Sequence, residues 1–443
     1  MSARSGLSFA VAVVGALLGG DMAFGQANSR AVFVSNNGNL EGSVSSFMIN
    51  PDDSLSFVDR VITGTRPTTA DPCSGCNSYE ISLTPNGRYL ATVHPAGAED
   101  GLAIYEVASD ATLSLVLLLT LPIGTDGPLD VQWMNDTLLA VALTTPSPDQ
   151  LALYTFDPVA PSLTAGPSTG VAGSIGYLAV HPSGLTLYVN DTTNKAVRAY
   201  TLRGGALSLV DTESTGAPFP LELAVSNDGT KLYAAGGISD GGNKVVGMNI
   251  APDRTLSPMA GTPFVSPGAS PSNVFVSDSL SHLIVGHGTD ATARTFSIDP
   301  VTGALTSTGN TFDVGLQGTL GDVRVLGDVV LITDNSTALD GLTGIYSFTL
   351  GAGGSLVSNG PIVLTNGIAP RSIAAWSPVL VAGDMDCDGD LDSDDVPAMA
   401  LALTDPAAYA STHPGCDPSV GDFNGDTLLD GEDIALFVDA LIP

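Results

Sequence analysis

Residues Gly176–Leu202 read GYLAVHPSGLTLYVNDTTNKAVRAYTL, and this stretch decides the fold. Three β-branched and aliphatic runs are separated by a His-Pro-Ser-Gly turn and by a polar loop that begins with Asn-Asp. Short runs with a period of two, interrupted by such turn residues, are typical of antiparallel strands joined in a meander. One meander cannot bury both faces of its sheet, so it needs neighbours of the same kind.

The same unit recurs through most of the chain. Its second strand is centred, in turn, near Leu90, Leu139, Leu187, Leu232, Leu283 and Val330. These steps of roughly 45 to 51 residues are typical of four-stranded propeller blades. The segment Arg30–Val61 lacks a first strand, and a lone first strand at 371–378 ends the series, so together they complete one composite blade. We therefore predict an all-β, seven-bladed β-propeller over residues 28–380, closed into a ring, rather than an open solenoid or tandem sandwiches.

Composition agrees with this architecture and excludes some partners. The 443 residues include 51 Gly and 29 Pro but only 14% charged residues, which suits a protein rich in strands and turns. A formal net charge of −32 argues against nucleic acid or an anionic membrane as a partner. The 14 Lys and Arg residues also leave few cations for gripping a phosphorylated substrate.

The N-terminus predicts export. Arg4 precedes the apolar run Phe9–Leu18, and small residues follow, so residues 1–27 are interpreted as a signal peptide. A permanent membrane anchor is the alternative, but the run is too short to cross a bilayer comfortably. No later stretch is long and apolar enough for a membrane span, and we expect a secreted or cell-surface protein. The four cysteines suit that oxidising compartment, with Cys73–Cys76 and Cys387–Cys416 the simplest of three possible pairings.

The repeat resembles a known family. The runs AVHPSGLTLYVND, LTPNGRYLATVHP and VSNDGTKLYAAGG are similar to the repeat of lactonase-type seven-bladed propellers, which include 6-phosphogluconolactonase-like and YVTN-repeat proteins. The resemblance covers roughly residues 30 to 380. Because one fold hosts many activities, it implies the fold more firmly than the chemistry.

After Gly383 the composition of the sequence changes to Asp-rich loops and helical runs, which predicts a second domain at 384–443. The loop 384–395 (DMDCDGDLDSDD) offers oxygen ligands from Asp384, Asp386, Asp388, Asp390 (carbonyl), Asp392 and Asp395. The loop 422–433 (DFNGDTLLDGED) repeats this with Asp422, Asn424, Asp426, Leu428 (carbonyl), Asp430 and Asp433. Ca²⁺ prefers six to eight oxygen ligands at such alternating positions, so two Ca²⁺ sites are predicted.

The second loop departs from the pattern at its sixth position, where Thr427 replaces the Gly389 of the first loop and a glycine stands at 425 instead. A helix is expected after each loop, at Val396–Leu403 and Ile434–Leu441. So small an α-helical domain has little core and should depend on Ca²⁺ for its fold. The alternative is a solvated acidic tail.

The two loop–helix halves resemble a type I dockerin, a duplicated F-hand calcium module. The resemblance implies docking onto a cohesin-like or cell-surface protein, with the tenth and eleventh loop residues, here Ser393-Asp394 and Gly431-Glu432, helping to choose the partner. The insert Thr404–Val420 is longer than the family pattern, which puts cohesin binding in question while leaving the prediction of calcium binding unchanged.

One column of residues is our candidate site in the ring. Aligning each unit on Val180 places one residue per blade at the start of the channel-lining strand: Glu80, Asp130, Tyr177, Glu222, Asn273, Asp322 and Ser372. Converging carboxylates raise each other's pKa or recruit a divalent metal, which suits catalysis. Alternatively, these residues only hydrate the channel or cap turns.

Two functions remain open on sequence alone. The first is a binding propeller that meets a small molecule, glycan or protein at its mouth and is attached to an assembly through the second domain. The second is a lactone hydrolase, whose implied catalytic residues are Glu80, Asp130, Glu222, Asp322 and Arg371. The lactonase resemblance carries over the Arg of a Pro-Arg-His run to Arg371, but Ser372 replaces the His.

Overall fold

The structure is a computed structural model of the chain. It describes residues 30–37, 42–63, 78–95, 101–121, 127–144, 148–216, 218–237, 243–315, 320–335, 343–377, 382–386, 391–413, 416, 418–425 and 428–441. The predicted signal peptide, three of the four cysteines (Cys73, Cys76 and Cys387) and the loop residues Asp388, Asp390 and Asp426 lie outside these ranges. The corresponding interpretations therefore stay predictions.

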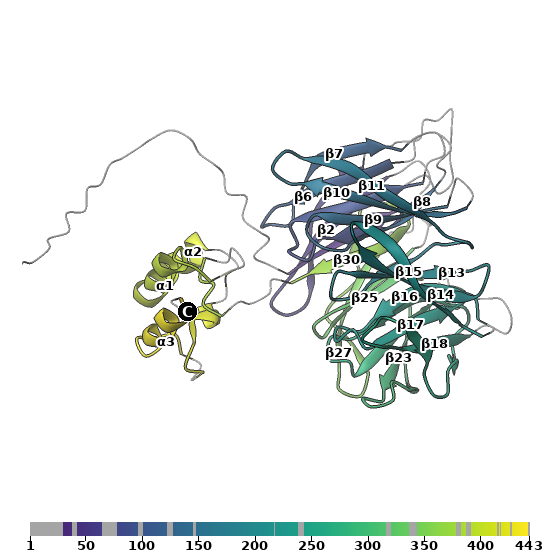
Figure 1. Cartoon of the computed structure of the whole chain (residues 1–443). Coiled ribbons are helices and arrows are strands. Elements are labelled where there is room, and N and C mark those ends of the chain that lie inside the picture. Colours follow the sequence, from purple (N-terminus) through teal and green to yellow (C-terminus); the bar gives the residue numbers. More distant parts are fainter. Residues whose placement is uncertain are drawn as a thin grey trace, which may run out of the picture.

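Seven antiparallel sheets form the ring, which confirms the predicted seven-bladed propeller (Figure 1). The first three complete blades are β4 (Ile81–Leu83), β5 (Tyr89–His94), β6 (Gly101–Val107), β7 (Leu113–Thr120); β8 (Pro128–Trp133), β9 (Leu138–Leu143), β10 (Gln150–Asp157), β11 (Ser162–Gly170); and β12 (Leu178–Val180), β13 (Thr186–Asp191), β14 (Ala196–Arg203), β15 (Ala206–Ser214). The next three are β16 (Pro220–Val225), β17 (Lys231–Gly236), β18 (Lys244–Ile250), β19 (Leu256–Pro258), β20 (Phe264–Val265); β21 (Pro271–Val276), β22 (His282–His287), β23 (Thr292–Ile298), β24 (Leu305–Asp313); and β25 (Leu320–Leu326), β26 (Val329–Asp334), β27 (Gly344–Leu350), β28 (Leu356–Ser358), β29 (Val363–Leu364).

The seventh blade joins the two ends of the propeller. It is built from β1 (Ala31–Asn36), β2 (Ser43–Ile49) and β3 (Leu55–Ile62), with β30 (Pro370–Trp376) as its innermost strand. Strand β30 pairs antiparallel with β1, so that Ala31 faces Trp376 and Val34 faces Ile373. This pairing confirms the composite blade, and the closing strand begins one residue earlier than the predicted range 371–378.

The hydrophobic core lies between the blades. Seven clusters of buried side chains each draw on two neighbouring blades, so that every interface of the ring has its own core. Three equivalent turns between first and second strands use a glycine with positive φ: Gly87 (71°), Gly184 (67°) and Gly229 (69°). A side chain would strain the backbone there, which explains why PNG, PSG and NDG recur in the repeat.

Three helices and a short 3₁₀ turn follow the ring. They are α1 (Asp395–Thr404), α2 (Pro406–Thr412), η2 (Pro418–Gly421) and α3 (Ile434–Leu441). The first and last match the predicted helices, whereas α2 falls in the insert and was not predicted. The sequence nevertheless contains the signals of a helix start. The Asp405 side chain accepts a hydrogen bond from the Ala408 N–H, and Pro406 occupies the first turn. None of the described helices is long and apolar enough to cross a membrane.

A buried histidine in β5 predicts an acid-sensitive ring. Within the described ranges neither ring nitrogen of His94 has a hydrogen-bond partner, and burial lowers the pKa of His94 to about 4 from an ordinary 6.5. A lowered folded-state pKa gives stability that is present above pH 6.5 and is lost as the pH falls toward 4. Between these two pH values the parent should lose about 2 to 3 kcal/mol of its free energy of unfolding through His94, and His94→Leu should not show this loss.

Urea unfolding at about pH 7 and about pH 4.5 gives the free energy of unfolding of the variant and of the parent at each pH. The effects of all other titrating groups cancel when the two proteins are compared. His287→Leu is the comparison variant: burial also lowers the pKa of His287, but the hydrogen bond with the Thr292 carbonyl opposes this shift, so a smaller effect than that of His94→Leu is expected. An identical pH dependence in His94→Leu and the parent protein would contradict the prediction.

Candidate functional site in the central channel

The inner strands bring the predicted column together around the channel. Glu80, Glu222 and Tyr177 line the same cavities, and Asn273 and Asp322 line the smaller of them. Six of the seven column residues are buried, and Tyr177 is half-buried. Two arginines from inner strands, Arg324 on β25 and Arg371 on β30, complete this charged layer.

Arg371 links three blades. Its Nε donates to Glu80 Oε1 at 3.3 Å, and its Nη2 donates to the Tyr177 hydroxyl at 3.0 Å. The guanidinium carbon lies 3.7 Å from the centroid of the Tyr79 ring. Glu80 and Tyr79 directly precede β4, and Tyr177 directly precedes β12, so each polar group sits where its strand begins. An aromatic face and a carboxylate together hold the planar cation in one orientation.

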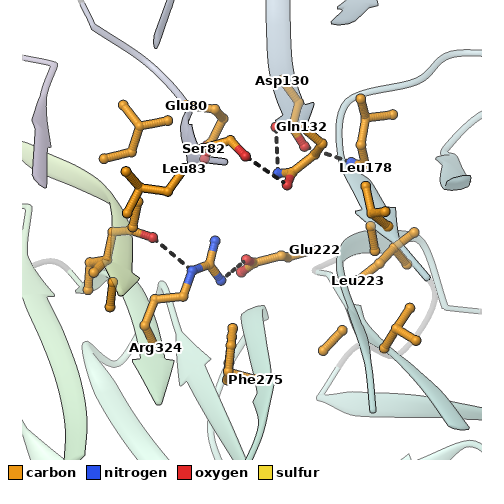
Figure 2. A pocket seen from close by; sticks show the side chains of 18 of the residues that line it. Glu80, Ser82, Leu83, Asp130, Gln132, Leu178, Glu222, Leu223, Phe275 and Arg324 are labelled. Carbon is orange, nitrogen blue, oxygen red and sulfur yellow. Dashed lines mark hydrogen bonds and ion pairs between the residues drawn. The ribbon is translucent and has the colours of Figure 1, made fainter. Parts of the chain in front are cut away.

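Arg324 makes a second, separate cluster. Its Nη1 donates to Glu222 Oε1 at 2.6 Å, its Nη2 lies 3.4 Å from Asp322 Oδ2, and its Nε donates to the Ile373 carbonyl at 2.9 Å. The guanidinium lies over the Phe275 ring at 5.2 Å, between the blade that supplies it and the blade of Glu222. Figure 2 shows Arg324 reaching across the pocket to Glu222. Arg324 and Asp322 lie two residues apart on the same strand, so both side chains lie on one face of β25.

Two of the predicted acids instead join neighbouring blades. Asp130 Oδ2 accepts the Leu178 N–H at 2.7 Å, and Asp130 Oδ1 accepts the Val131 N–H at 2.6 Å. Asp322 uses the same geometry, with Oδ2 accepting from the Ile373 N–H at 2.8 Å and Oδ1 from the Val323 N–H at 2.7 Å. Their position thus serves the fold, since each carboxyl satisfies an amide of the next inner strand.

The carboxyl groups outnumber the cations in this layer. Burial raises the pKa of Glu80, repulsion from Glu222 raises it further, and the Arg371 guanidinium opposes both effects. Burial also raises the pKa of Asp130 and of Asp322 well above the ordinary value, and the Arg324 charge offsets this only in part for Asp322. Four acids face two guanidinium groups, so the layer is short of positive charge.

The charged layer separates two cavities. A cavity of about 170 Å³ lies on the side where the inner strands begin and is lined by Arg371, Asn273 and Asn335. A wider cavity of about 370 Å³ lies toward the strand ends and is lined by Arg324, Gln132 and Phe275. Glu80, Tyr177 and Glu222 line both cavities. Glu222 Oε2 is buried and has no hydrogen-bond partner among the described residues.

Sequence reasoning missed the aromatic partners of the site. Tyr177 belongs to the column but is not among the predicted catalytic residues, yet its hydroxyl accepts a hydrogen bond from Arg371. Tyr79 was not considered, although it carries the guanidinium on its ring. Tyr79 directly precedes the column residue Glu80, and Tyr177 is itself a column residue, so their positions in the repeat are the signal that could have pointed to them.

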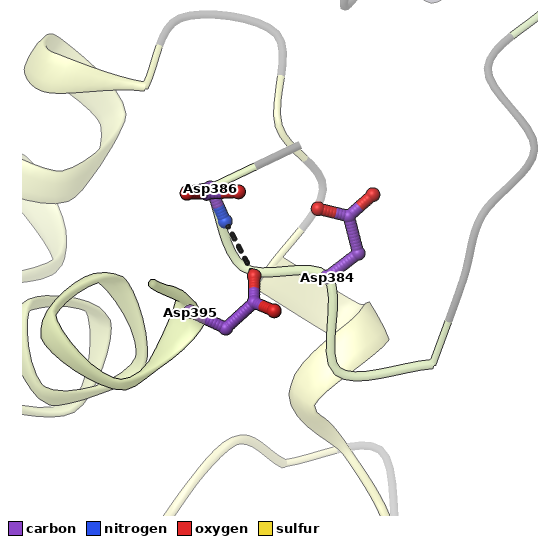
Figure 3. A group of neighbouring side chains, drawn as sticks. All are labelled: Asp384, Asp386 and Asp395. Carbon is purple, nitrogen blue, oxygen red and sulfur yellow. Dashed lines mark hydrogen bonds between the residues drawn. The ribbon is translucent and has the colours of Figure 1, made fainter. Parts of the chain in front are cut away.

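Outside the ring, part of the first acidic loop forms a candidate metal centre. Among the described residues, three acids bring one carboxylate oxygen each within 4.8 Å of one another: Asp384, Asp386 and Asp395 (Figure 3). Asp395, the twelfth loop residue, is buried at the start of α1 and accepts N–H hydrogen bonds from Met385 (2.6 Å), Asp386 (3.1 Å) and Asp392 (2.8 Å).

The second loop repeats this bonding. Asp433 Oδ1 accepts from the N–H groups of Phe423 (2.9 Å) and Asn424 (3.1 Å), and Asp433 Oδ2 accepts from that of Asp430 (2.9 Å). Gly425, at loop position four, has a φ of 75° and donates its N–H to Asp422 Oδ1 at 2.8 Å. The glycine that moved from position six therefore still provides a left-handed turn.

Comparison with known proteins supports the fold of the ring. The family model described as "Lactonase, 7-bladed beta-propeller" matches residues 148–320. No curated protein matches the chain.

Solved structures give the same architecture. The periplasmic gluconolactonase of Pseudomonas aeruginosa has a TM-score of 0.63 and 18% identity, over 79% of this chain and 99% of that one. A protein from Lactobacillus plantarum also scores 0.63, with 15% identity over 79% and 99% of the two chains. A protein from Bacteroides uniformis, provisionally named a 6-phosphogluconolactonase, scores 0.61 with 14% identity over 79% and 100%. At these identities the likeness shows the fold alone.

Proposed function

We propose that the propeller hydrolyses a small, unphosphorylated sugar lactone in the cavity beside Arg371. The observation that carries this proposal is the Arg371–Glu80 pair, which places a fixed cation and a carboxyl of raised pKa in the wall of one small cavity. The lactonase family match over 148–320 and the gluconolactonase among the structural neighbours support the same chemistry.

Each group has a role in opening a lactone ring. Arg371 Nη1 makes no hydrogen bond to another described residue, and it polarises the lactone carbonyl and stabilises the oxyanion that forms. Glu80 accepts the proton from the attacking water and returns it to the ring oxygen as the C–O bond breaks. The Tyr177 hydroxyl and the Tyr79 ring position Arg371.

The charge of the layer limits the substrate. Its four carboxyl groups and two guanidinium groups leave no surplus cation, and both guanidinium groups are already paired. A phosphate monoester would meet repulsion and find no free bidentate partner. We therefore expect a neutral aldonolactone to be opened faster than its phosphorylated counterpart.

Replacing Glu80 with Gln tests the proposal. The amide cannot accept the proton from water. We therefore expect the enzymatic rate of gluconolactone opening, corrected for the uncatalysed rate, to fall by about 100-fold or more. In the parent protein the rate should decline as the pH falls through the raised pKa of Glu80, because the protonated carboxyl is no longer a base. Proton release measured across pH follows both effects. Parent and Glu80→Gln proteins with equal turnover would refute the role of Glu80.

A binding propeller without catalysis is the second candidate. It is favoured by the commitment of Asp130 and Asp322 to backbone amides and of Arg324 to Glu222 and Asp322, which leaves only the Arg371 group for chemistry. The same assay separates the two candidates, because a binding propeller shows no turnover of any sugar lactone above the uncatalysed rate.

We further propose that the C-terminal helices carry two Ca²⁺ sites. The donor set fits, since hard carboxylate oxygens converge in the first loop and the second loop repeats its hydrogen bonds around Asp433. The twelfth residue of each loop is held by backbone amides at the start of a helix. Bound Ca²⁺ would neutralise the acidic loops and hold them in this conformation.

Export and attachment complete the proposal. A secreted propeller would be attached to a cohesin-like or cell-surface protein through its C-terminal helices. Ser393-Asp394 and Gly431-Glu432, the pairs expected to choose the partner, are all exposed. Apolar side chains are exposed in the same region, as a docking surface requires: Val396, Leu428, Ile434, Leu436 and Val438.

A further inference from the structure

We propose that the wide cavity at the strand ends is a second binding site, which takes a primary ammonium group on an unbranched apolar stem. The cavity lies on the opposite side of the charged layer from Arg371 and the proposed lactone site. Its two ends differ sharply in chemistry. The floor is the charged layer, whereas the outer part is apolar.

The floor offers a buried acceptor that no described residue satisfies. Glu222 is only 6% exposed, its Oε1 is bonded to Arg324, and its Oε2 has no hydrogen-bond partner in the part of the chain that the structure describes. An unpaired buried carboxylate oxygen is costly, so a ligand that donates a hydrogen bond to it gains binding energy. Figure 2 shows Glu222 and Arg324 facing each other within this pocket.

The charge balance selects a cation. Glu80, Asp130, Glu222 and Asp322 face only Arg324 and Arg371, as described above. A metal ion does not suit this floor, because the described carboxylates that converge at metal-binding distance are those of the C-terminal loop and not those of the channel. An ammonium group supplies one positive charge and three donors without needing converging ligands.

The upper part of the cavity selects the stem. Small side chains along the inner strands leave the space open: Ser82, Ala179, Ala224 and Ala374. One residue further along, six blades contribute apolar side chains, which we call the collar: Leu83, Val180, Val225, Val276, Val325 and Ala375. The collar lies three residues beyond the column position of Glu222, about 10 Å at ~3.3 Å per residue. A linear alkyl stem spans this depth while its ammonium group reaches Glu222.

Titration calorimetry of the full chain with n-hexylammonium tests the site, with 1-hexanol as the uncharged probe. We expect 1-hexanol to bind at least about tenfold more weakly, since it lacks the charge that Glu222 requires. A third probe, Nα-acetyl-lysine amide, asks whether a lysine side chain is accepted as well as a free amine. Equal affinity for the amine and the alcohol, or no binding of the amine, would overturn the proposal.

Two variants test the site, and the second of them separates it from the proposed lactone site. Glu222→Gln should weaken n-hexylammonium binding by about tenfold or more. Ala375→Leu narrows the collar without touching the charged layer, so it should weaken amine binding similarly while leaving lactone turnover unchanged. The melting temperature is measured alongside, because Ala375 also packs against the core between two blades. If amine binding survives both substitutions, the site is wrong. Lactone turnover without amine binding, or the reverse, shows which of the two proposals fails.

Discussion

Replacing Arg371 with Met is expected to lower kcat/KM for lactone opening by about 100- to 1,000-fold, which is the usual cost of removing one donor that stabilises a developing oxyanion. The loss should fall on kcat, because the donor acts mainly on the charge that forms during the reaction. Arg371→Lys should restore only part of the rate. A lysine ammonium cannot keep both the Glu80 and the Tyr177 contact while it lies flat on the Tyr79 ring.

Arg294→Met is the matched control for this experiment. Arg294 also pairs with an acid, Asp290, at 3.7 Å, but it lies on β23 away from both channel cavities. Its replacement should leave turnover unchanged. Because Glu80 is left unpaired in Arg371→Met, the melting temperature must be compared as well. A folded Arg371→Met protein with parental turnover would exclude a catalytic role for Arg371.

Replacing Asp395 with Asn is expected to reduce the number of bound Ca²⁺ ions from two to one. Asn lacks the charge, and its amide nitrogen cannot accept the N–H hydrogen bonds that now reach one of the Asp395 oxygens. The double variant Asp395→Asn/Asp433→Asn should bind none. Calorimetric titration of the full chain with Ca²⁺ gives the stoichiometry directly, and the helical signal in circular dichroism reports whether the C-terminal helices persist.

The neighbouring acid Asp394 provides the control. It is exposed, precedes α1, and its side chain makes no capping hydrogen bond. Asp394→Asn removes the same charge one residue away and should retain both Ca²⁺ ions. Loss of Ca²⁺ binding in both variants would mean that net charge, and not the geometry around Asp395, binds the ion. A parent chain that binds no Ca²⁺ would refute the calcium proposal.

The sequence predicts the ring well because its signals are local and repeated. Turn glycines such as Gly184 require positive φ, and the strands between them alternate with a period of two, so the same unit can be counted along the chain. Even the composite blade follows from counting, since one end lacks the strand that the other supplies. Helix α2 was not predicted because the sequence of the insert has little hydrophobic periodicity.

The candidate site could be predicted only in part. Alignment of the repeats identifies which residues share a level of the channel, and Glu80, Tyr177 and Glu222 of that column line the same cavities. Arg371 does not belong to the column and was indicated only by the family resemblance. It cannot show that Asp130 turns its carboxyl to the Leu178 amide, since this depends on the distance between two blades. Nor can it show that Arg324 passes over Phe275 to reach Glu222. Contacts that skip a blade leave no trace in a periodic pattern.

The pairing of β30 with β1 also determines the order in which the ring can fold. The two strands are separated by nearly the whole propeller, and neither can find its partner until the ribosome has completed both. Six blades can form their own sheets during synthesis, but the last interface stays open until Pro370–Trp376 has emerged. The nascent chain therefore remains without its closing strand for most of translation.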